Sequence, residues 1–246
     1  MDKMLYVAMT GAKNIMLAQA INNNNLANIN TTGFRGDLAL FDSSPIEGSG
    51  YPSRINTTVT GTQVDMSPGT LNNTGRQLDV AVNGNGLIAV QAPDGSEAYT
   101  RAGNLQINSV GLLTTAGGDP VMGNGGPIAI PPNQKLEIGA DGTISILPIG
   151  QSPSTLAIVD RIKLVSGANQ QLVKTPDGLL KTASGANLTA DATVSLQSGV
   201  LESSNVNAID ALANMIELSR HYEAQVKLLK AAEDNDTAGS QLVSLS

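Results

Sequence analysis

The strongest constraint on the fold is the way helical and strand-like patterns divide the chain. Residues 1–30 and 205–246 carry apolar residues at the spacing of one helix face. The span between them consists of short apolar runs separated by Gly, Pro, Asn and Asp, which is typical of strands and turns. We therefore predict a mixed, mainly β fold, in which N- and C-terminal α-helices flank an all-β middle domain that is barrel- or sandwich-like.

The N-terminal segment has an apolar seam that advances in alternating steps of three and four residues. This is the spacing of a helix face and of a coiled coil. Polar Gln19 and Asn22 interrupt the seam, and polar seam residues cost stability but fix the register of a helix pair. The pattern stops at Thr31-Thr32-Gly33, where Gly favours a helix end. The apolar seam residues are Leu5, Ala8 or Met9, Ala12, Ile15 or Met16, Leu26 and Ile29.

The C-terminal segment predicts one long helix. It opens with Ser203-Ser204-Asn205, which are good N-cap residues, and no helix breaker occurs from Val206 to Ala238. Neither terminal helix can bury its stripe alone, so we predict that the two pair as a coiled-coil-like assembly element. The seam in this helix comprises Val206, Ile209, Leu212, Ile216, Ser219, Tyr222, Val226 and Leu229.

Turn signals between the apolar runs predict several β-hairpins in the middle of the chain. Asn-Gly and Asp-Gly between apolar runs are strong hairpin signals. They occur at Asn83-Gly84, Asp94-Gly95, Asp141-Gly142 and Asp177-Gly178. The predicted domains are a terminal helical core (1–30 and 205–246), extended connectors (31–69 and 186–204) and a β-rich outer domain (70–185).

Composition excludes several classes of function. The formal net charge is −7, so the chain has no basic field for nucleic acid. It contains no Cys and one His, which removes disulfides, thiolate catalysis and Cys-based metal sites. No apolar run is long enough for membrane insertion, and the N-terminus has neither a basic region nor an apolar core that would indicate a cleaved signal peptide.

Three fragments imitate functional motifs without the required context. Residues 84–89 fit the pattern G-x-G-x-x-A, but an apolar strand run follows where a dinucleotide site needs a helix. Residues 234–245 begin like an EF-hand loop but lack the carboxylate at the last position. A lone His221 on a helix is typical of a solvated or interface residue. We therefore predict that the chain is not an enzyme and has no catalytic, metal or cofactor-binding site.

Both ends carry residues that resemble a known family. Residues 24–35 (NNLANINTTGFR) and 198–208 (SGVLESSNVNA) closely resemble the end signatures of the bacterial flagellar rod and hook axial proteins. Residues 76–86 and 99–104 also resemble segments of that family, so the similarity spans nearly the whole chain. Residues 1–12 look like the opening of a proximal-rod subunit. Leu87-Ile88 departs from the family, in which aromatic residues often follow the Gly-x-Gly turn.

This resemblance implies a structural subunit of the flagellar basal-body rod. Such proteins are exported by the flagellar type III apparatus without a cleaved signal peptide and assemble in the periplasm into a shaft that transmits torque from motor to hook. The implied partners are other proximal- and distal-rod subunits, further copies of itself, the export apparatus and the rod cap. Two alternatives remain open: a distal-rod subunit, or a secreted β-rich adhesin-like binding protein with the helices as a dimerisation stalk.

The candidate functional residues are therefore assembly residues. We expect seam residues of one helix to face those of the other, within or between subunits, and to order fully only on assembly. Asn side chains at the junctions either bridge subunits or act as ordinary caps, and Phe34 and Arg35 favour an interface. The set comprises Leu5, Met9, Ile15, Asn25, Leu26, Asn28, Ile29, Phe34, Arg35, Asn205, Val206, Asn207, Ile209, Leu212, Ile216, Tyr222, Val226 and Leu229.

Overall fold

The chain forms two compact units, each built from segments that are distant in the sequence. The computed structural model describes residues 3–45, 55–150, 156–168 and 170–244. The first unit, called here the helical unit, comprises Met1–Ala27, Asp37–Gln63 and Asn207–Ser246. The second, called the β unit, comprises Asn28–Gly36 and Val64–Val206. The chain therefore passes between the units near residues 27, 36, 63 and 206.

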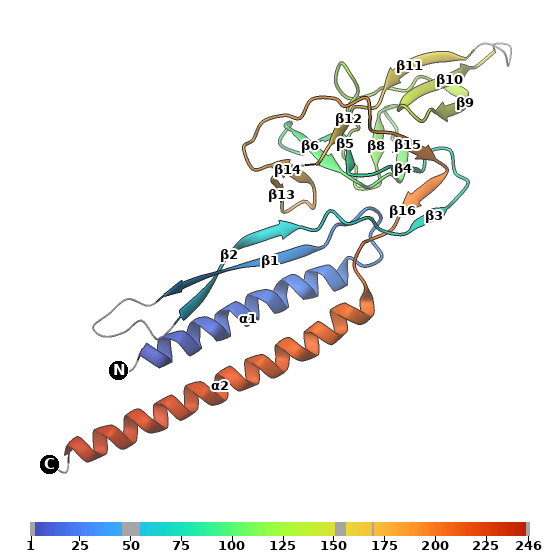
Figure 1. The fold of residues 1–246 in the computed structure, drawn as a ribbon. Helices are drawn as coiled ribbons and strands as arrows, with labels where there is room; N and C mark the ends of the chain where they lie inside the picture. The colour runs from blue at the N-terminus through green and yellow to red at the C-terminus, as the bar shows by residue number, and fades with distance from the viewer. Residues whose placement is uncertain (1–2, 46–54, 151–155, 169, 245–246) are drawn as a thin grey trace. The chain divides into compact units, whose positions relative to one another are not determined.

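The helical unit contains two long antiparallel helices and a pair of strands. The helices are α1 (Lys3–Ala27) and α2 (Ala208–Ser244), and the strands are β1 (Asp37–Pro45) and most of β2 (Ile55–Val64). In Figure 1, α1 lies between α2 and the strand pair, in agreement with its contacts to α2 and β1. The predicted terminal helices are confirmed. Neither helix in the described part of the chain is long and apolar enough to cross a membrane.

The start of α2 differs from the prediction. The sequence predicts N-cap residues at Ser203-Ser204-Asn205, but α2 begins at Ala208. The Oδ1 atom of Asn207 accepts a hydrogen bond from the backbone N of Ile209 at 2.9 Å, so Asn207 is the N-cap. Asn205 cannot cap the helix because its side chain is bonded to the backbone of Gly36 and of Asp65.

Strands also form in the segments described above as connectors. β1 pairs with β2, whose sequence INTTVTGTQV is rich in β-branched Thr and Val. Near the other end of the chain, β15 (Leu196–Ser198) pairs with β4 (Val80–Val82), and β16 (Val200–Glu202) pairs with β3 (Leu71–Asn73). β2 and β15 are mostly polar, so their sequences lack the apolar alternation that identifies a half-buried strand.

The β unit consists of several small sheets. The largest has five strands in the order β12-β5-β6-β14-β13, and a three-stranded sheet has the order β11-β10-β9. None of the sheets in the described part of the chain closes into a barrel. The strands are β5 (Gly86–Gln91), β6 (Glu97–Thr100), β7 (Leu105–Ile107), β8 (Leu113–Thr115), β9 (Asn133–Ile138), β10 (Thr143–Pro148), β11 (Ala157–Arg161), β12 (Leu164–Ser166), β13 (Leu172–Lys174) and β14 (Leu180–Thr182).

Three of the four predicted hairpin turns are confirmed. Antiparallel strands pair across Asp94-Gly95, Asp141-Gly142 and Asp177-Gly178. The prediction at Asn83-Gly84 is wrong, because β4 pairs with β15 and β5 pairs with β6 and β12. The turn is still tight, with Gly84 at a φ of 63°, but it connects strands of different sheets. Because β5 is a strand, residues 84–89 also lack the helix that a dinucleotide site requires.

The core of the β unit is built almost entirely from aliphatic side chains. One buried cluster gathers residues from most of the sheets, including Val80, Ile88, Leu105, Ile144 and Ile162. A smaller cluster surrounds Tyr99, with Leu87 and Val165 among its members. This agrees with a composition of 2% aromatic residues and no Trp, which leaves Val, Ile, Leu and Ala to fill the interior.

Substitution of Ile88 tests this core. Ile88 on β5 is completely buried, so Ile88→Ala is expected to lower the free energy of unfolding by about 2–5 kcal/mol through lost burial and a residual cavity. The matched control is Ile158→Ala on β11, which removes the same atoms from an exposed position and is expected to cost less than about 0.5 kcal/mol. Urea denaturation of the full chain measures both. Equal losses would contradict the assigned core.

Candidate functional site

The two helices pack through one face of α2 that carries both small and large side chains. Its buried or half-buried positions recur in steps of three and four, from Ala208 and Ala211 through Tyr222 to Leu229 and Ala232. At this face the Nδ2 of Asn22 donates to the backbone O of Ala211 at 2.8 Å. This bond joins a seam residue of α1 to α2 and fixes the register of the pair, as polar seam residues do.

α1 presents different residues on three sides. Ala8 and Ala12 are buried, and Leu5, Ile15 and Leu26 are half-buried on the same seam. A second side meets the strand pair, where the Nδ2 of Asn14 donates to the backbone O of Thr57. A Cβ atom added at Gly11 would lie 3.2 Å from the side chain of Gln225 on α2, so the two helices approach closely there.

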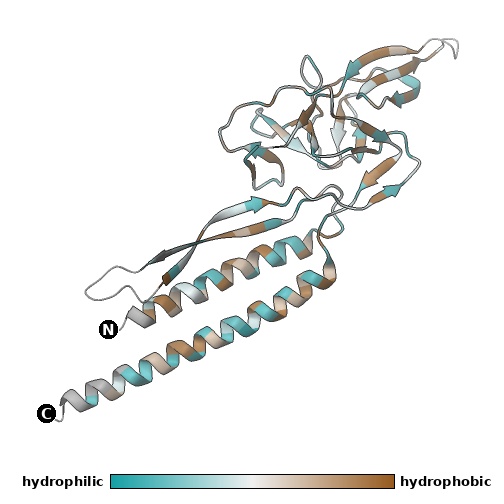
Figure 2. Cartoon of the chain, in the orientation of Figure 1, coloured by the Kyte–Doolittle hydropathy of each residue, from teal (hydrophilic) through white to brown (hydrophobic). Residues whose placement is uncertain are grey.

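The third side of α1 and a second face of α2 are apolar and exposed. Figure 2 shows apolar and polar residues interleaved along both helices. On α2, Ile209 is 76% exposed, Leu212 49% and Ile216 57%, and Val226 follows on the same face. We call these four residues the exposed α2 stripe. Tyr6, Met9, Met16 and Leu17 are exposed on α1 and form the outer stripe of α1.

The predicted seam residues therefore divide between the two faces. Leu5, Ile15 and Leu26 on α1 and Tyr222 and Leu229 on α2 are half-buried. Met9 and the four residues of the exposed α2 stripe are exposed, so the helical unit leaves a large part of each side chain uncovered. Two other members of the set lie beyond the helices: Ile29 follows the end of α1 and Val206 precedes α2, both half-buried.

Asparagine residues near the ends of the helices have local roles in the fold. The side chain of Asn25 bonds to both the N and the O of Asp37, which ties α1 to the first residue of β1. Asn28 accepts hydrogen bonds from the backbone N and the Oγ1 of Thr31, in the turn after α1. Asn28 and Asn207 thus have turn and capping roles, whereas Asn25 and Asn205 bond to segments that are distant in the sequence.

Phe34 and Arg35 form part of the β unit's own structure. The Nζ atom of Lys174 on β13 lies 4.1 Å from the centroid of the Phe34 ring and also donates to the backbone O of Arg35. The Arg35 side chain is buried and forms an ion pair with Glu202. Arg35 was predicted as an interface residue, but its burial leaves no side-chain surface for another subunit.

Glu202 is the centre of a buried ion cluster that no local sequence pattern reveals. Its carboxylate accepts from the Nη2 of Arg35 and from the backbone N of Gly69, and it lies 2.8 Å from the Nη2 of Arg101. All three charged side chains are only 2–3% exposed. Burial lowers the pKa of Arg101 to about 10, an effect that the charge of Glu202 opposes, so Arg101 remains charged at neutral pH.

Two glycines allow the backbone to approach this cluster. The backbone N of Gly33 donates to the O of Glu202, and Gly33 adopts a φ of 67°. A Cβ atom at Gly33 would lie 2.3 Å from the backbone C of Arg101, and one at Gly69 would lie 2.1 Å from the O of Ser203. The Glu202 cluster thus joins the segment after α1, the segment after β2 and the strand that leads to α2.

Comparison with known proteins assigns the family. The model described as flagellar basal body rod FlgEFG protein C-terminal matches residues 197–242, and the flagellar hook protein FlgE/F/G D1 domain matches residues 81–146. Over the full length of both proteins, the chain is 40% identical to the flagellar basal-body rod protein FlgF of Salmonella typhimurium and 41% identical to that of Escherichia coli. It is 33% identical to FlgG of Bacillus subtilis, over 95% of this chain and 96% of that protein.

The chain belongs to the flagellar basal-body rod protein family. The family models cover both kinds of structure described above. One contains β16 and most of α2, and the other begins in β4 and ends in β10. Two residues of the Glu202 cluster lie within the segments that the family models match. Glu202 is in the C-terminal match and Arg101 is in the D1 match.

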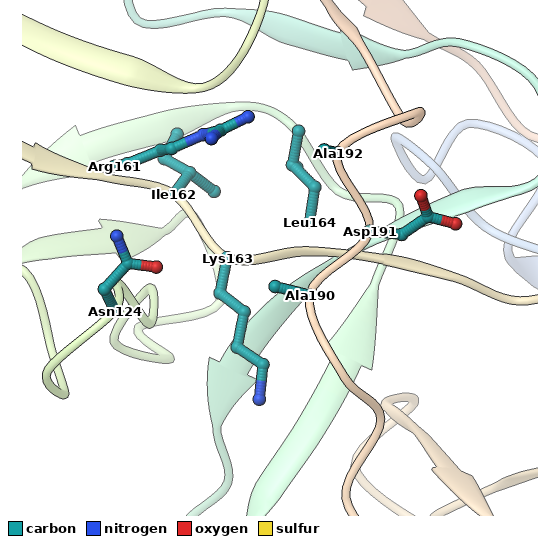
Figure 3. Close-up of a pocket in the computed structure, with 8 residues that line it drawn as sticks. All are labelled: Asn124, Arg161, Ile162, Lys163, Leu164, Ala190, Asp191 and Ala192. Atoms are coloured by element: carbon teal, nitrogen blue, oxygen red, sulfur yellow. The ribbon is translucent and has the colours of Figure 1, made fainter.

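A surface pocket on this rod-family chain does not form a ligand site of useful size. It holds about 100 Å³ between Asn124, Arg161 and the segment around Asp191, against the 300–1,000 Å³ of typical ligand pockets. In Figure 3 the charged ends of Arg161 and Lys163 point away from each other. Both are engaged, since Lys163 binds Glu97 and the Nε of Arg161 donates to the O of Asp141.

His221 is exposed on α2, 3.5 Å from Glu217.

Substitution of Glu202 tests the cluster. Glu202→Gln leaves two buried guanidinium groups without a carboxylate, so the free energy of unfolding is expected to fall by about 3–5 kcal/mol. The matched control is Glu137→Gln, which breaks the exposed pair with Lys135 and is expected to cost less than about 1 kcal/mol. Chemical denaturation measures both variants. A small loss for Glu202→Gln would show that the cluster does not stabilise the β unit.

Proposed function

We propose that this chain is a structural subunit of the flagellar basal-body rod and that it polymerises through its terminal helices. The support is membership of the rod protein family together with the surface of the helical unit. As a rod subunit it would transmit torque from the motor to the hook. Its partners would be further copies, other proximal- and distal-rod subunits and the rod cap, and it would reach the periplasm through the type III export apparatus without cleavage of a signal peptide.

The exposed α2 stripe is the observation that carries this proposal. Ile209, Leu212 and Ile216 lie at helix spacing on one face of α2, whereas α1 covers a different face. Burial of a few hundred Å² of apolar surface contributes several kcal/mol at about 25 cal/mol per Å², before the costs of ordering. A contact of this kind between subunits would stabilise a polymer, and large exposed apolar patches commonly mark protein interaction sites.

The outer stripe of α1 supplies a second, different apolar surface. It contains Tyr6, Met9, Met16 and Leu17. Leu is the one residue type that it shares with the exposed α2 stripe, so the two surfaces differ in composition. When two different surfaces of one subunit meet on neighbouring copies, the contact repeats without closing unless the rotation completes a ring. The two stripes therefore support helical assembly of the kind that a rod requires.

The sequence similarities support a proximal-rod identity over the distal-rod alternative. The relatives named FlgF are 40–41% identical over the whole of both chains, and FlgG of Bacillus subtilis is 33% identical over 95% of this one. The adhesin-like alternative has no such support, because the similarity to rod proteins extends through the β unit. We propose that the β unit is the outer domain of the subunit in the rod.

Charged substitutions on the exposed α2 stripe test the proposed function. Leu212→Glu combined with Ile216→Glu places two carboxylates where a neighbour's apolar surface would pack, so we expect loss of swimming motility and at least about a 10-fold fall in the chain recovered in purified basal bodies. The strain would lack the native gene and express each variant. Because the positions are exposed, circular dichroism and the unfolding midpoint of the purified chain should be unchanged.

The matched control is Asn214→Glu, which adds a carboxylate to the same helix at an exposed position off the stripe. It should support motility and normal recovery in basal bodies. Normal incorporation of the double variant would refute assembly through the exposed α2 stripe.

A further inference from the structure

Methionine is the only sulfur-containing residue in this chain, because the sequence contains seven Met and no Cys. The structure describes the side chains of five of these methionines. Met9 is 54% exposed and Met16 57%, whereas Met66, Met122 and Met215 are half-buried. Since exposure governs the access of a dissolved oxidant to a thioether, Met9 and Met16 are the members of this set that an oxidant reaches first.

The packing of these methionines explains the difference. Met66 and Met122 lie against the smaller apolar cluster of the β unit, around Tyr99. Met215 lies on the face of α2 that also carries Ala211 and is half-buried. Met9 and Met16, in contrast, are seven residues apart, so they lie on the same side of α1, in its outer stripe.

We propose that Met9 and Met16 are oxidation sites of the free subunit and that their oxidation blocks assembly. The oxidant is a peroxide: one oxygen atom of hydrogen peroxide forms a bond to the thioether sulfur, the O–O bond breaks, and water leaves. The sulfur loses two electrons to the peroxide and becomes a sulfoxide. This converts a flexible apolar side chain into a polar one, and it does so within an apolar contact surface.

The inference rests on the proposed function, because it requires the outer stripe of α1 to be buried in the rod. Assembly would then cover both sulfur atoms and protect them from peroxide. Only a subunit that has not yet been incorporated into the rod would be sensitive to oxidation. Methionine sulfoxide is reversible by the sulfoxide reductases, which would return a blocked subunit to the assembly-competent form.

The first experiment measures the rate of oxidation at each position. The purified full-length chain is treated with hydrogen peroxide, and peptide mass spectrometry follows each methionine. We expect oxidation of Met9 and Met16 to be at least about 5-fold faster than that of Met66 and Met122, in line with their exposure. Rates within about 2-fold of one another would overturn the assignment of the sites.

The second experiment measures incorporation into the rod. Cells that express each variant receive a peroxide pulse before assembly, and the chain in purified basal bodies is quantified. Recovery of each variant is divided by that of the same variant without peroxide. This ratio should fall several-fold for the native chain and stay near one for Met9→Leu with Met16→Leu, because Leu is apolar and has no thioether to oxidise. Met66→Leu with Met122→Leu is the matched control and should fall like the native chain. An equal fall in all three would overturn the inference.

A third variant tests, without peroxide, whether a polar side chain at both sites reduces incorporation. It distinguishes a failure of this inference from a failure of the proposed function, and it can be used even if the Leu variant does not assemble. Met9→Gln with Met16→Gln places a polar side chain of similar length at both sites and should reduce incorporation without peroxide. Normal incorporation of this Gln variant would overturn the inference alone, provided that the charged α2 variant fails to assemble. Normal incorporation of both would instead refute the proposed assembly.

Discussion

Each terminal helix has more apolar surface than its partner helix can cover. α1 and α2 are in contact, and the small residues Ala8, Ala12 and Ala211 are buried in the helical unit. The bulkier residues Ile209, Leu212 and Ile216 are left on another face of α2, exposed to solvent. Exposed surface of this kind is a liability for a protein that stays monomeric and an asset for one that polymerises. In a chain of the rod protein family, we propose that this excess of apolar surface drives assembly.

The Glu202 cluster plays a different part, because it fixes the chain within the β unit next to the points where the chain leaves it. Arg35 precedes β1, and Glu202 is followed within a few residues by α2. Removal of one partner from a buried ion pair is strongly destabilising. The pair between Arg35 and Glu202 therefore holds the segment before β1 and the segment before α2 in the β unit. Gly33 and Gly69 also lie close to neighbouring backbone, so a side chain at either position would collide with it. The junctions are thus part of the folded β unit.

The sequence was sufficient for the helices and for most of the hairpins, because both depend on local patterns. It failed where the outcome depends on distant residues. Asn83-Gly84 has strong turn chemistry, but β15 is the strand that pairs with β4. Glu202 and Arg35 are 167 positions apart, and one sequence gives no means to match them. Of the predicted α2 seam, Tyr222 and Leu229 are half-buried whereas Ile209, Leu212 and Ile216 are exposed, because apolar spacing alone does not show which face of a helix meets its partner.

The absence of cysteine makes the central claim directly measurable. A single cysteine at position 216, made by Ile216→Cys, is a unique maleimide target on the exposed α2 stripe, and Asn214→Cys provides a second exposed site on the same helix. The measurement is the rate of labelling at each site in the purified chain and in isolated basal bodies. Assembly through the stripe predicts that Ile216→Cys reacts readily in the free chain and at least about 10-fold more slowly in the rod, as expected for a buried position. Equal labelling of Ile216→Cys in the two states would contradict it.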